Sequence, residues 1–214
     1  MEETMRALDD LVRCGKARYV GCSNYFAWQI VKANSIADRL QLSRFISGQH
    51  MYSLLRRDIE LEILPACSDQ GMSMLCWSPL AGGMLTGKYD RKQGPAPESR
   101  VGVRREIDLP RYWSDQNFKV IDELLSVAAE NEKAPSQVAL AWLLADRRIT
   151  AVVVGARTVE QIETSLEAGD WDLPGTLRDR LSNVVPFEHG YPQEWIDMTW
   201  SNISGKEEFP PWTL

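Results

Sequence analysis

The stretch Val154-Gly155-Ala156-Arg157-Thr158 decides between the folds that the chain could adopt. The apolar run 151–154 is typical of a buried strand, and a helical pattern continues from Thr158 to Leu166. A strand that enters a helix through this turn offers backbone N–H groups and the Arg157 guanidinium to an anion. Barrels of parallel strands often hold phosphate at the loops of their final strands. We therefore interpret the stretch as the last strand-to-helix junction of a barrel, with an anion site.

Three similar strand-to-helix units precede this junction along the chain. Strands are predicted at residues 19–22, 45–51, 72–77 and 151–154, and helices at 2–13, 28–39, 58–70, 117–131, 135–145, 158–166 and 174–183. Strands that alternate with helices predict a parallel sheet. By itself, the alternation fits both a doubly wound sheet and a barrel.

The end of each predicted strand carries residues that are capable of chemistry. The four ends hold, in order, Ser23-Asn24, then Gln49 and Tyr52, then Trp77-Ser78, and finally Gly155-Ala156-Arg157. In a barrel of βα units these ends converge on one face, where ligand sites lie. The polar strand ends therefore favour the barrel, with parallel strands and an α/β fold.

The length of 214 residues fits a single domain, 1–214, with a sizeable buried core. Residues 80–115 are rich in Gly, Pro and Arg and show no sustained period, which predicts a long loop that is either functional or partly disordered. The tail 186–214 carries Trp195, Trp200 and Trp212, and we expect it to be docked on the body.

Composition excludes several classes of protein. The net charge of −6 argues against a partner nucleic acid, and no apolar run approaches the ~20 residues that span a membrane. The acidic amino terminus is unlike a secretory signal. No metal site is expected, because the four cysteines lack CxxC spacing and only His50 and His189 could join them. Reduced thiols and a cytoplasmic location are expected instead.

Four segments carry a resemblance to a known family: Gly15 to Asn24, Gln49 to Arg57, Trp77 to Tyr89, and Val154 to Gln161. In this order and spacing they resemble the last four strands of the aldo-keto reductases, in the branch with bacterial reductases and potassium-channel β subunits. The resemblance covers about residues 1–185. It implies a (β/α)8 barrel of the TIM type, of which this chain holds only the last four βα units, a half barrel. It also implies the cofactor NADP(H) and a small-molecule carbonyl substrate.

The resemblance places the nicotinamide end of the cofactor at the first three strands. Ser23, Asn24 and Gln49 would bind the carboxamide, and Trp77 would stack on the nicotinamide ring. Each residue also has a purely structural interpretation. Ser23 and Asn24 could form a strand cap or an Asx turn, Gln49 could be a satisfied polar side chain, and Trp77 could be part of the core.

The resemblance assigns the rest of the cofactor to the later segments. Ser78, Pro79, Leu80 and Lys88 would line the path of the pyrophosphate, with Arg100 closing over it, although an isolated loop cation is usually just solvated. Gly155, Arg157 and Gln161 would address the adenosine end, where an arginine favours NADP(H) over NAD(H) by holding a 2′-phosphate. Relatives have a Glu-Asn pair facing adenine. The shorter Thr164 and Ser165 stand there, so adenine contacts are expected to be weaker.

No catalytic residue is assigned. In the family an Asp, a Tyr, a Lys and a His come from the first four strands, which have no match in this sequence, and His50, His189, Tyr52 and Tyr89 lie in other motifs. The chain could be part of a normal reductase, a half barrel that dimerises, or a non-enzymatic module that binds a cofactor or a partner. Open strand edges invite pairing with another segment. That segment would be a missing amino-terminal half or a second copy.

Overall fold

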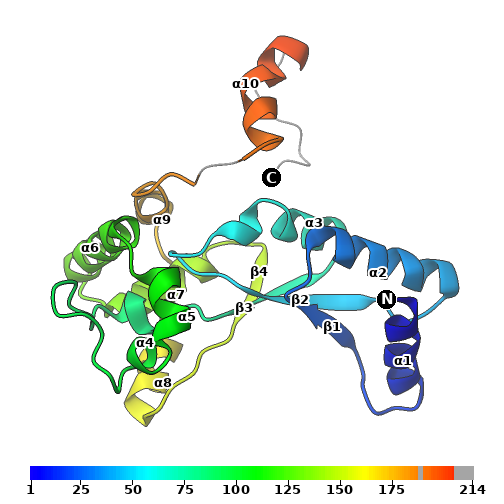
Figure 1. Cartoon of the computed structure of the whole chain (residues 1–214), viewed down its shortest axis with the longest axis horizontal. Helices are drawn as coiled ribbons and strands as arrows, with labels where there is room; N and C mark the ends of the chain where they lie inside the picture. Colours follow the sequence, from blue (N-terminus) through cyan, green and yellow to red (C-terminus); the bar gives the residue numbers. More distant parts are fainter. Residues whose placement is uncertain (188–189, 205–214) are drawn as a thin grey trace.

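The sheet consists of four parallel strands in sequence order. A computed structural model describes residues 1–187 and 190–204 and shows strands β1 (Val20–Ser23), β2 (Phe45–Met51), β3 (Ser73–Trp77) and β4 (Ile149–Val152) (Figure 1). Their order is β1-β2-β3-β4, and every neighbouring pair is parallel. The predicted parallel α/β arrangement is confirmed.

The fourth strand lies two residues earlier than predicted. It begins at Ile149, directly after a turn in which the Ile149 N–H donates to the Asp146 carbonyl oxygen at 2.9 Å. Ile149 is buried and lies opposite Met74 of β3, so the pairing starts there. The sequence predicts a later start because Arg147 and Arg148, directly before Ile149, are charged and interrupt the apolar pattern.

Helices precede, separate and follow the four strands along the chain. They are α1 (Glu2–Arg13), α2 (Ala27–Leu40), α3 (Ile63–Asp69), α4 (Arg100–Val103), α5 (Arg105–Tyr112), α6 (Asp115–Glu130), α7 (Pro135–Leu144), α8 (Val159–Leu166), α9 (Gly175–Ser182) and α10 (Gln193–Ser204), with 3-10 turns η1 (Asp58–Glu60), η2 (Ala81–Thr86) and η3 (Glu167–Asp170). The expected single helix 58–70 is wrong, since η1 and α3 are separate. Pro65 has no N–H to donate, so it fits only in the first turn of α3.

The segment 80–115, which the sequence predicted to be a long loop, is built largely from short helical elements. It contains η2, α4 and α5, which are too short to show a period in the sequence. Gly82 and Gly83 interrupt η2 with φ angles of 67° and 91°. Those angles lie in the left-handed region, which glycine adopts without strain. Local turns therefore shape this segment.

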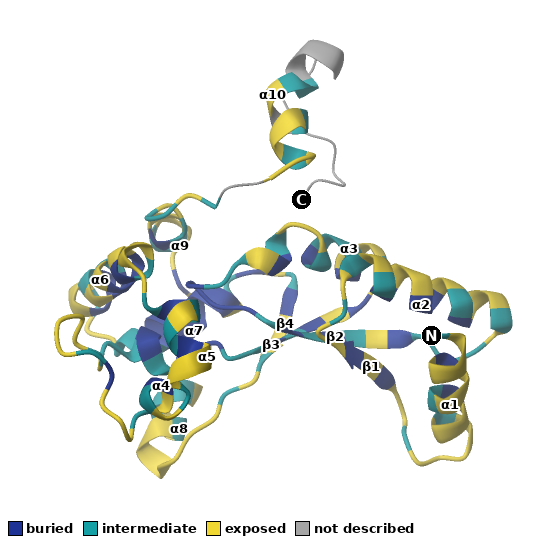
Figure 2. Cartoon of the chain, viewed as in Figure 1, coloured by how far each residue is buried: buried dark blue, intermediate teal, exposed yellow. Residues whose placement is uncertain are grey.

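One face of the sheet is covered and the other is open. Alternate residues, among them Cys22, Phe45, Met74 and Ile149, are buried where α2, α3 and α7 contact β2, β3 and β4. On the open face Ser23, Ser73 and Ala151 are exposed, as the mixed colours along the strands indicate (Figure 2). β1 and β4 are the edge strands, and neither has a partner on its outer side within the described residues.

The tail leads away from the body. The Arg57 guanidinium lies 5.4 Å from the centre of the Phe187 ring, which anchors the start of the tail. Beyond it, α10 stands apart from the sheet (Figure 1), and Trp195 and Met198 are 50% and 69% exposed. The tail is thus docked on the body at Phe187, as expected, whereas Trp195 and Met198 remain largely exposed. Trp212 and His189 lie outside the described residues.

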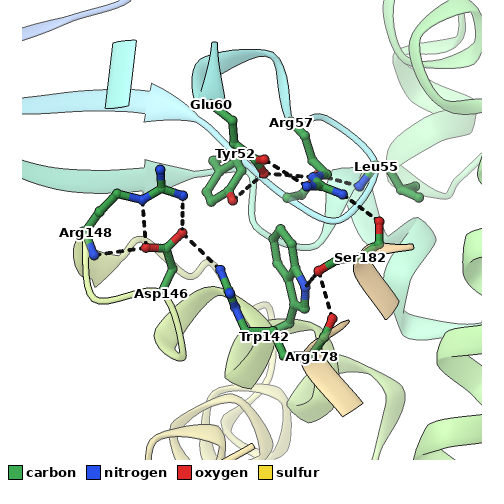
Figure 3. A network of polar contacts seen from close by, with 10 residues as sticks. Tyr52, Leu55, Arg57, Glu60, Trp142, Asp146, Arg148, Arg178 and Ser182 are labelled. Atoms are coloured by element: carbon green, nitrogen blue, oxygen red, sulfur yellow. Dashed lines mark hydrogen bonds and ion pairs between the residues drawn. The ribbon is translucent and has the colours of Figure 1, made fainter. Parts of the chain in front are cut away.

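A buried polar network joins the segment after β2 to α7 and α9 (Figure 3). Tyr52 donates to Glu60 Oε1 at 2.6 Å, and Glu60 accepts two hydrogen bonds of 2.8 Å from Arg57. Arg57 also donates to the Ser182 carbonyl oxygen at 2.7 Å, and the Trp142 indole N–H donates to Ser182 Oγ at 2.9 Å. Tyr52, expected among the strand-end residues, therefore belongs to the packing behind the sheet.

The thiols provide a first test of the fold. Cys14 is exposed, whereas burial raises the pKa of Cys22 and Cys67 to about 11 and that of Cys76 to about 12. At pH 8 no more than about one in a thousand of such thiols is a thiolate. A thiol reagent should therefore titrate Cys14 alone in the native chain and all four cysteines in denaturant. Rapid reaction of a second thiol under native conditions would contradict this burial.

Residues 1–187 and 190–204 contain neither a cluster of metal ligands nor a membrane-spanning helix. No group of three or more His, Cys, Asp or Glu residues there could hold a metal ion. None of the helices in that part of the chain has the length and apolar character needed to cross a membrane.

Candidate functional site

Hydrogen bonds connect the carboxyl ends of the first three strands. The Trp77 indole N–H donates to Asn24 Oδ1 at 3.1 Å, although the two residues are 53 positions apart. Asn24 Nδ2 donates to Ser23 Oγ at 3.1 Å, and Ser23 Oγ donates to the Gln49 carbonyl oxygen at 2.9 Å. The structure therefore brings together Ser23, Asn24, Gln49 and Trp77, as the sequence predicted.

Asn24 owes its position to an unusual backbone conformation. Its φ is 58°, in the left-handed region, where asparagine is among the few non-glycine residues commonly found. The side chain reaches Trp77 and Ser23, while the Phe26 N–H, which an Asx turn would use, donates to Gln29 Oε1 at 2.9 Å. The Asx turn is thus not the arrangement observed. Ser78 has a φ of 57°, so two strand ends carry the strain that often accompanies functional sites.

Gln49 has a side chain that remains available for a ligand. It is half-buried and lies between Ser23 and Leu75 in the register of the sheet. Within the described part of the chain its side-chain amide has no hydrogen-bond partner among protein groups, and its partial exposure leaves it open to solvent or a ligand. The next residue, His50, lies on the covered face, where burial lowers its pKa and leaves Nε2 without a hydrogen bond.

Two exposed cations lie beside the same glycine turn. A Cβ at Gly83 would be 2.8 Å from Lys88 Nζ, and a Cβ at Gly82 would be 3.8 Å from Arg100 Cγ. Neither cation forms an ion pair within the described residues. Ser78 and Leu80 are half-buried and lead into this turn, whereas Pro79 is buried. The predicted pyrophosphate residues therefore gather at one turn after β3.

The junction before α8 has a free cation and an occupied backbone donor. The Arg157 guanidinium is exposed and has no ion-pair partner in the described residues. Its backbone N–H donates to Gln161 Oε1 at 2.9 Å, and Thr158 Oγ1 accepts from the Gln161 N–H at 3.3 Å. The Gln161 side chain is thus used as a helix cap. Gly155 is exposed, and a Cβ there would meet nothing within 4 Å.

Thr164 and Ser165 use their hydroxyls within α8. Thr164 Oγ1 donates to the Glu160 carbonyl oxygen and Ser165 Oγ to that of Gln161, each at 2.8 Å. Such bonds to the preceding turn are common for Ser and Thr inside helices. These hydroxyls could therefore still accept a hydrogen bond from adenine, but to donate one they would have to give up a bond within α8.

Two residues beside the glycine turn have no counterpart in the sequence-based prediction. The Tyr89 hydroxyl donates to the Gly82 carbonyl oxygen and accepts from the Val101 N–H, each at 3.2 Å. Asp108 is only 2% exposed, and its Oδ2 has no hydrogen bond and lies 3.8 Å from Arg104 Nε. The Gly-Gly pair signals a turn, but no local pattern links it to these side chains.

Comparison with known proteins places the chain in a family. The profile described as "Aldo/keto reductase family" matches residues 1–179. The chain is 34% identical over 195 residues to "Uncharacterized oxidoreductase YrpG" of Bacillus subtilis (strain 168), covering 90% of this chain and 56% of that protein. It is 36% identical over 172 residues to a "Probable voltage-gated potassium channel subunit beta" of Oryza sativa subsp. japonica, covering 79% of this chain and 52% of the relative.

A third relative carries the name of a reductase. "Versiconal hemiacetal acetate reductase" of Aspergillus parasiticus is 33% identical over 165 residues, or 77% of this chain and 47% of that protein. The chain thus spans about half the length of the curated relatives that it matches. The expected resemblance, including its bacterial and channel-subunit branch, is confirmed. The chain belongs to the aldo/keto reductase family.

Proposed function

We propose that this chain forms the cofactor-binding half of an NADP(H)-dependent reductase of aldehydes or ketones. The observation that carries the proposal is the chain of hydrogen bonds from Trp77 through Asn24 and Ser23 to Gln49, which joins three strand ends. When bound, the cofactor would supply the hydride for carbonyl reduction. The residues of this chain hold and orient it.

The nicotinamide end fits the polar groups that remain free. Asn24 Nδ2 has a second N–H to donate beyond its bond to Ser23. The Gln49 amide offers both a donor and an acceptor, which matches the two functions of a carboxamide. Trp77 is half-buried and fixed through its indole N–H, so its ring can serve as a rigid stacking surface.

The phosphates fit the cations. Lys88 and Arg100 stand beside the Gly82-Gly83 turn, where the pyrophosphate would pass. Arg157 stands at the start of α8, where the helix dipole also favours an anion. These positions support NADP(H) rather than NAD(H), since only NADP(H) brings a 2′-phosphate to Arg157.

Replacement of Arg157 tests the choice of cofactor. Hydrogen bonds to charged groups contribute about 1.5–3 kcal/mol, so Arg157→Ala should weaken NADP(H) binding about ten- to a hundredfold. NAD(H) binding should scarcely change, because that cofactor lacks the phosphate. Titration by quenching of tryptophan fluorescence measures both. Arg147→Ala is the matched control, since Arg147 is exposed at the amino end of β4. Equal losses for the two cofactors would contradict the assignment.

The edges of the sheet support a half barrel that another segment completes. β1 and β4 have no outer partners in the described residues, and Val153 after β4 is 43% exposed. Gly21, Ser47 and Ser73 are neighbours across the open face and are all small. Barrel interiors are filled largely by bulky side chains. Two copies would place small residues on both sides, which favours an amino-terminal half with larger inner residues over a second copy.

The free cysteines bear on the cellular compartment, and the name of one relative bears on the alternative function. A reducing compartment such as the cytoplasm would keep the four cysteines free. A non-enzymatic module remains the alternative function, and the channel-subunit name of the rice relative favours it. This alternative predicts cofactor binding without turnover even when the barrel is complete.

A further inference from the structure

The hydroxyl of Tyr89 ties three parts of the segment after β3 to one point. It donates to the Gly82 carbonyl oxygen and accepts from the Val101 N–H, both at 3.2 Å. Gly82 belongs to the glycine turn, and Val101 is fully buried in α4, 12 residues beyond Tyr89. One oxygen therefore fixes the distance between the turn and α4.

The two cations of the proposed pyrophosphate site are sequence neighbours of Tyr89 and of its partner Val101. Lys88 precedes Tyr89, and its Nζ lies 5.1 Å from the centre of the Tyr89 ring. Arg100 precedes Val101 at the first position of α4. Without the Tyr89 hydroxyl, neither hydrogen bond would hold Arg100 against the turn that carries Lys88.

The ring of Tyr89 is held independently of its hydroxyl. It packs edge-on against Trp113 at 6.0 Å between centroids, and it also contacts Lys88 Nζ. A phenylalanine at this position keeps both ring contacts. Tyr89→Phe thus removes the two hydrogen bonds alone.

We infer that Tyr89 is a positioning residue for a diphosphate, setting the spacing of Lys88 and Arg100 across the Gly82-Gly83 turn. This inference rests on the proposed cofactor function and adds a residue that acts through the cations without touching the ligand. A diphosphate that is bound by both cations requires them to be placed correctly relative to each other, so a residue that fixes this placement should strengthen binding.

The test measures binding of NADP(H) and of inorganic pyrophosphate by calorimetry to the 214-residue chain. Loss of two neutral hydrogen bonds should weaken the binding of both ligands about three- to tenfold in Tyr89→Phe. Tyr112→Phe is the matched control. Tyr112 is buried in the same segment, but among the described residues its hydroxyl hydrogen-bonds only to the Met51 sulfur, at 3.7 Å. The control should bind both ligands as the unchanged chain does.

A double variant separates positioning from a general structural effect. If Tyr89 acts through Arg100, then adding Tyr89→Phe to Arg100→Gln should cost little more affinity than Arg100→Gln alone. Losses that simply add would show that the hydroxyl only stabilises the fold, and would overturn the inference. Unchanged binding in Tyr89→Phe would overturn it as well.

The two ligands distinguish this inference from the proposed function. Pyrophosphate binding that depends on Tyr89, without NADP(H) binding, would uphold the positioning role and reject the cofactor. NADP(H) binding that ignores Tyr89 would uphold the cofactor and reject the positioning role. A chain that binds neither ligand would reject both.

Discussion

The 214-residue chain by itself is expected to reduce an aromatic aldehyde with NADPH about 10²- to 10⁴-fold more slowly than a barrel with a positioned proton donor. The structure gives a physical reason for this. Burial and the nearby Glu60 carboxylate raise the pKa of Tyr52, and its hydroxyl donates a hydrogen bond to Glu60. The Tyr89 hydroxyl donates to the Gly82 carbonyl oxygen, and His50 lies on the covered face of the sheet. None of these three groups is therefore placed to donate a proton to a substrate.

A steady-state assay of NADPH oxidation measures this rate. The same preparation should bind NADP(H), which shows that low turnover does not reflect a misfolded chain. Supplying the amino-terminal half of the Bacillus relative as a second polypeptide should raise the rate if the two halves assemble. Rapid turnover by the chain alone would mean that its acid–base groups lie among residues to which we assign no such role.

Replacement of Arg57 should produce the largest loss of stability. Its side chain is 19% exposed and that of Glu60 is 13% exposed, and the two meet through paired hydrogen bonds (Figure 3). Removing one partner of a buried ion pair leaves the other charge uncompensated, at a cost of about 3–5 kcal/mol. Arg57→Ala should therefore lower the free energy of unfolding by about that amount, as measured by urea denaturation.

The neighbouring arginine is a matched control. Arg56 pairs with Asp58 at 2.9 Å, but the two side chains are 38% and 65% exposed. Solvent screens such a pair, so Arg56→Ala should cost at most about 1 kcal/mol. Tyr52→Phe removes only the hydroxyl that donates to the Glu60 carboxylate and should cost about 1.5–3 kcal/mol, less than Arg57→Ala. Similar losses for Arg56→Ala and Arg57→Ala would show that the network contributes no more than a surface pair.

Patterns within short stretches were enough to predict the sheet. Alternating strand and helix segments gave the parallel order, and the polar residues after each strand located Ser23, Asn24, Gln49 and Trp77. The boundaries were harder to predict. The strand that starts at Ile149 is preceded by charged residues, and the break before α3 depends on the N–H that Pro65 lacks.

Contacts between distant segments could not be predicted. The bond between Trp77 and Asn24 spans 53 residues, and nothing near either residue signals the other. The same holds for Tyr89, whose two partners are backbone groups and therefore leave no mark on residue type. The back-bonded hydroxyls of Thr164 and Ser165 are different, since the position of each hydroxyl inside a predicted helix could have indicated them.

The Gln161 side chain competes with any anion for a backbone donor at the start of α8. In the free chain this amide oxygen occupies the Arg157 N–H, which an incoming phosphate would otherwise take. Any ligand that uses this backbone donor must first displace the glutamine, and the penalty is the same for every such ligand. Capture by the Arg157 N–H alone therefore does not discriminate between cofactors. Under the proposed function, selectivity for NADP(H) would rest on the guanidinium of Arg157, so we expect a change of that one residue to alter cofactor preference.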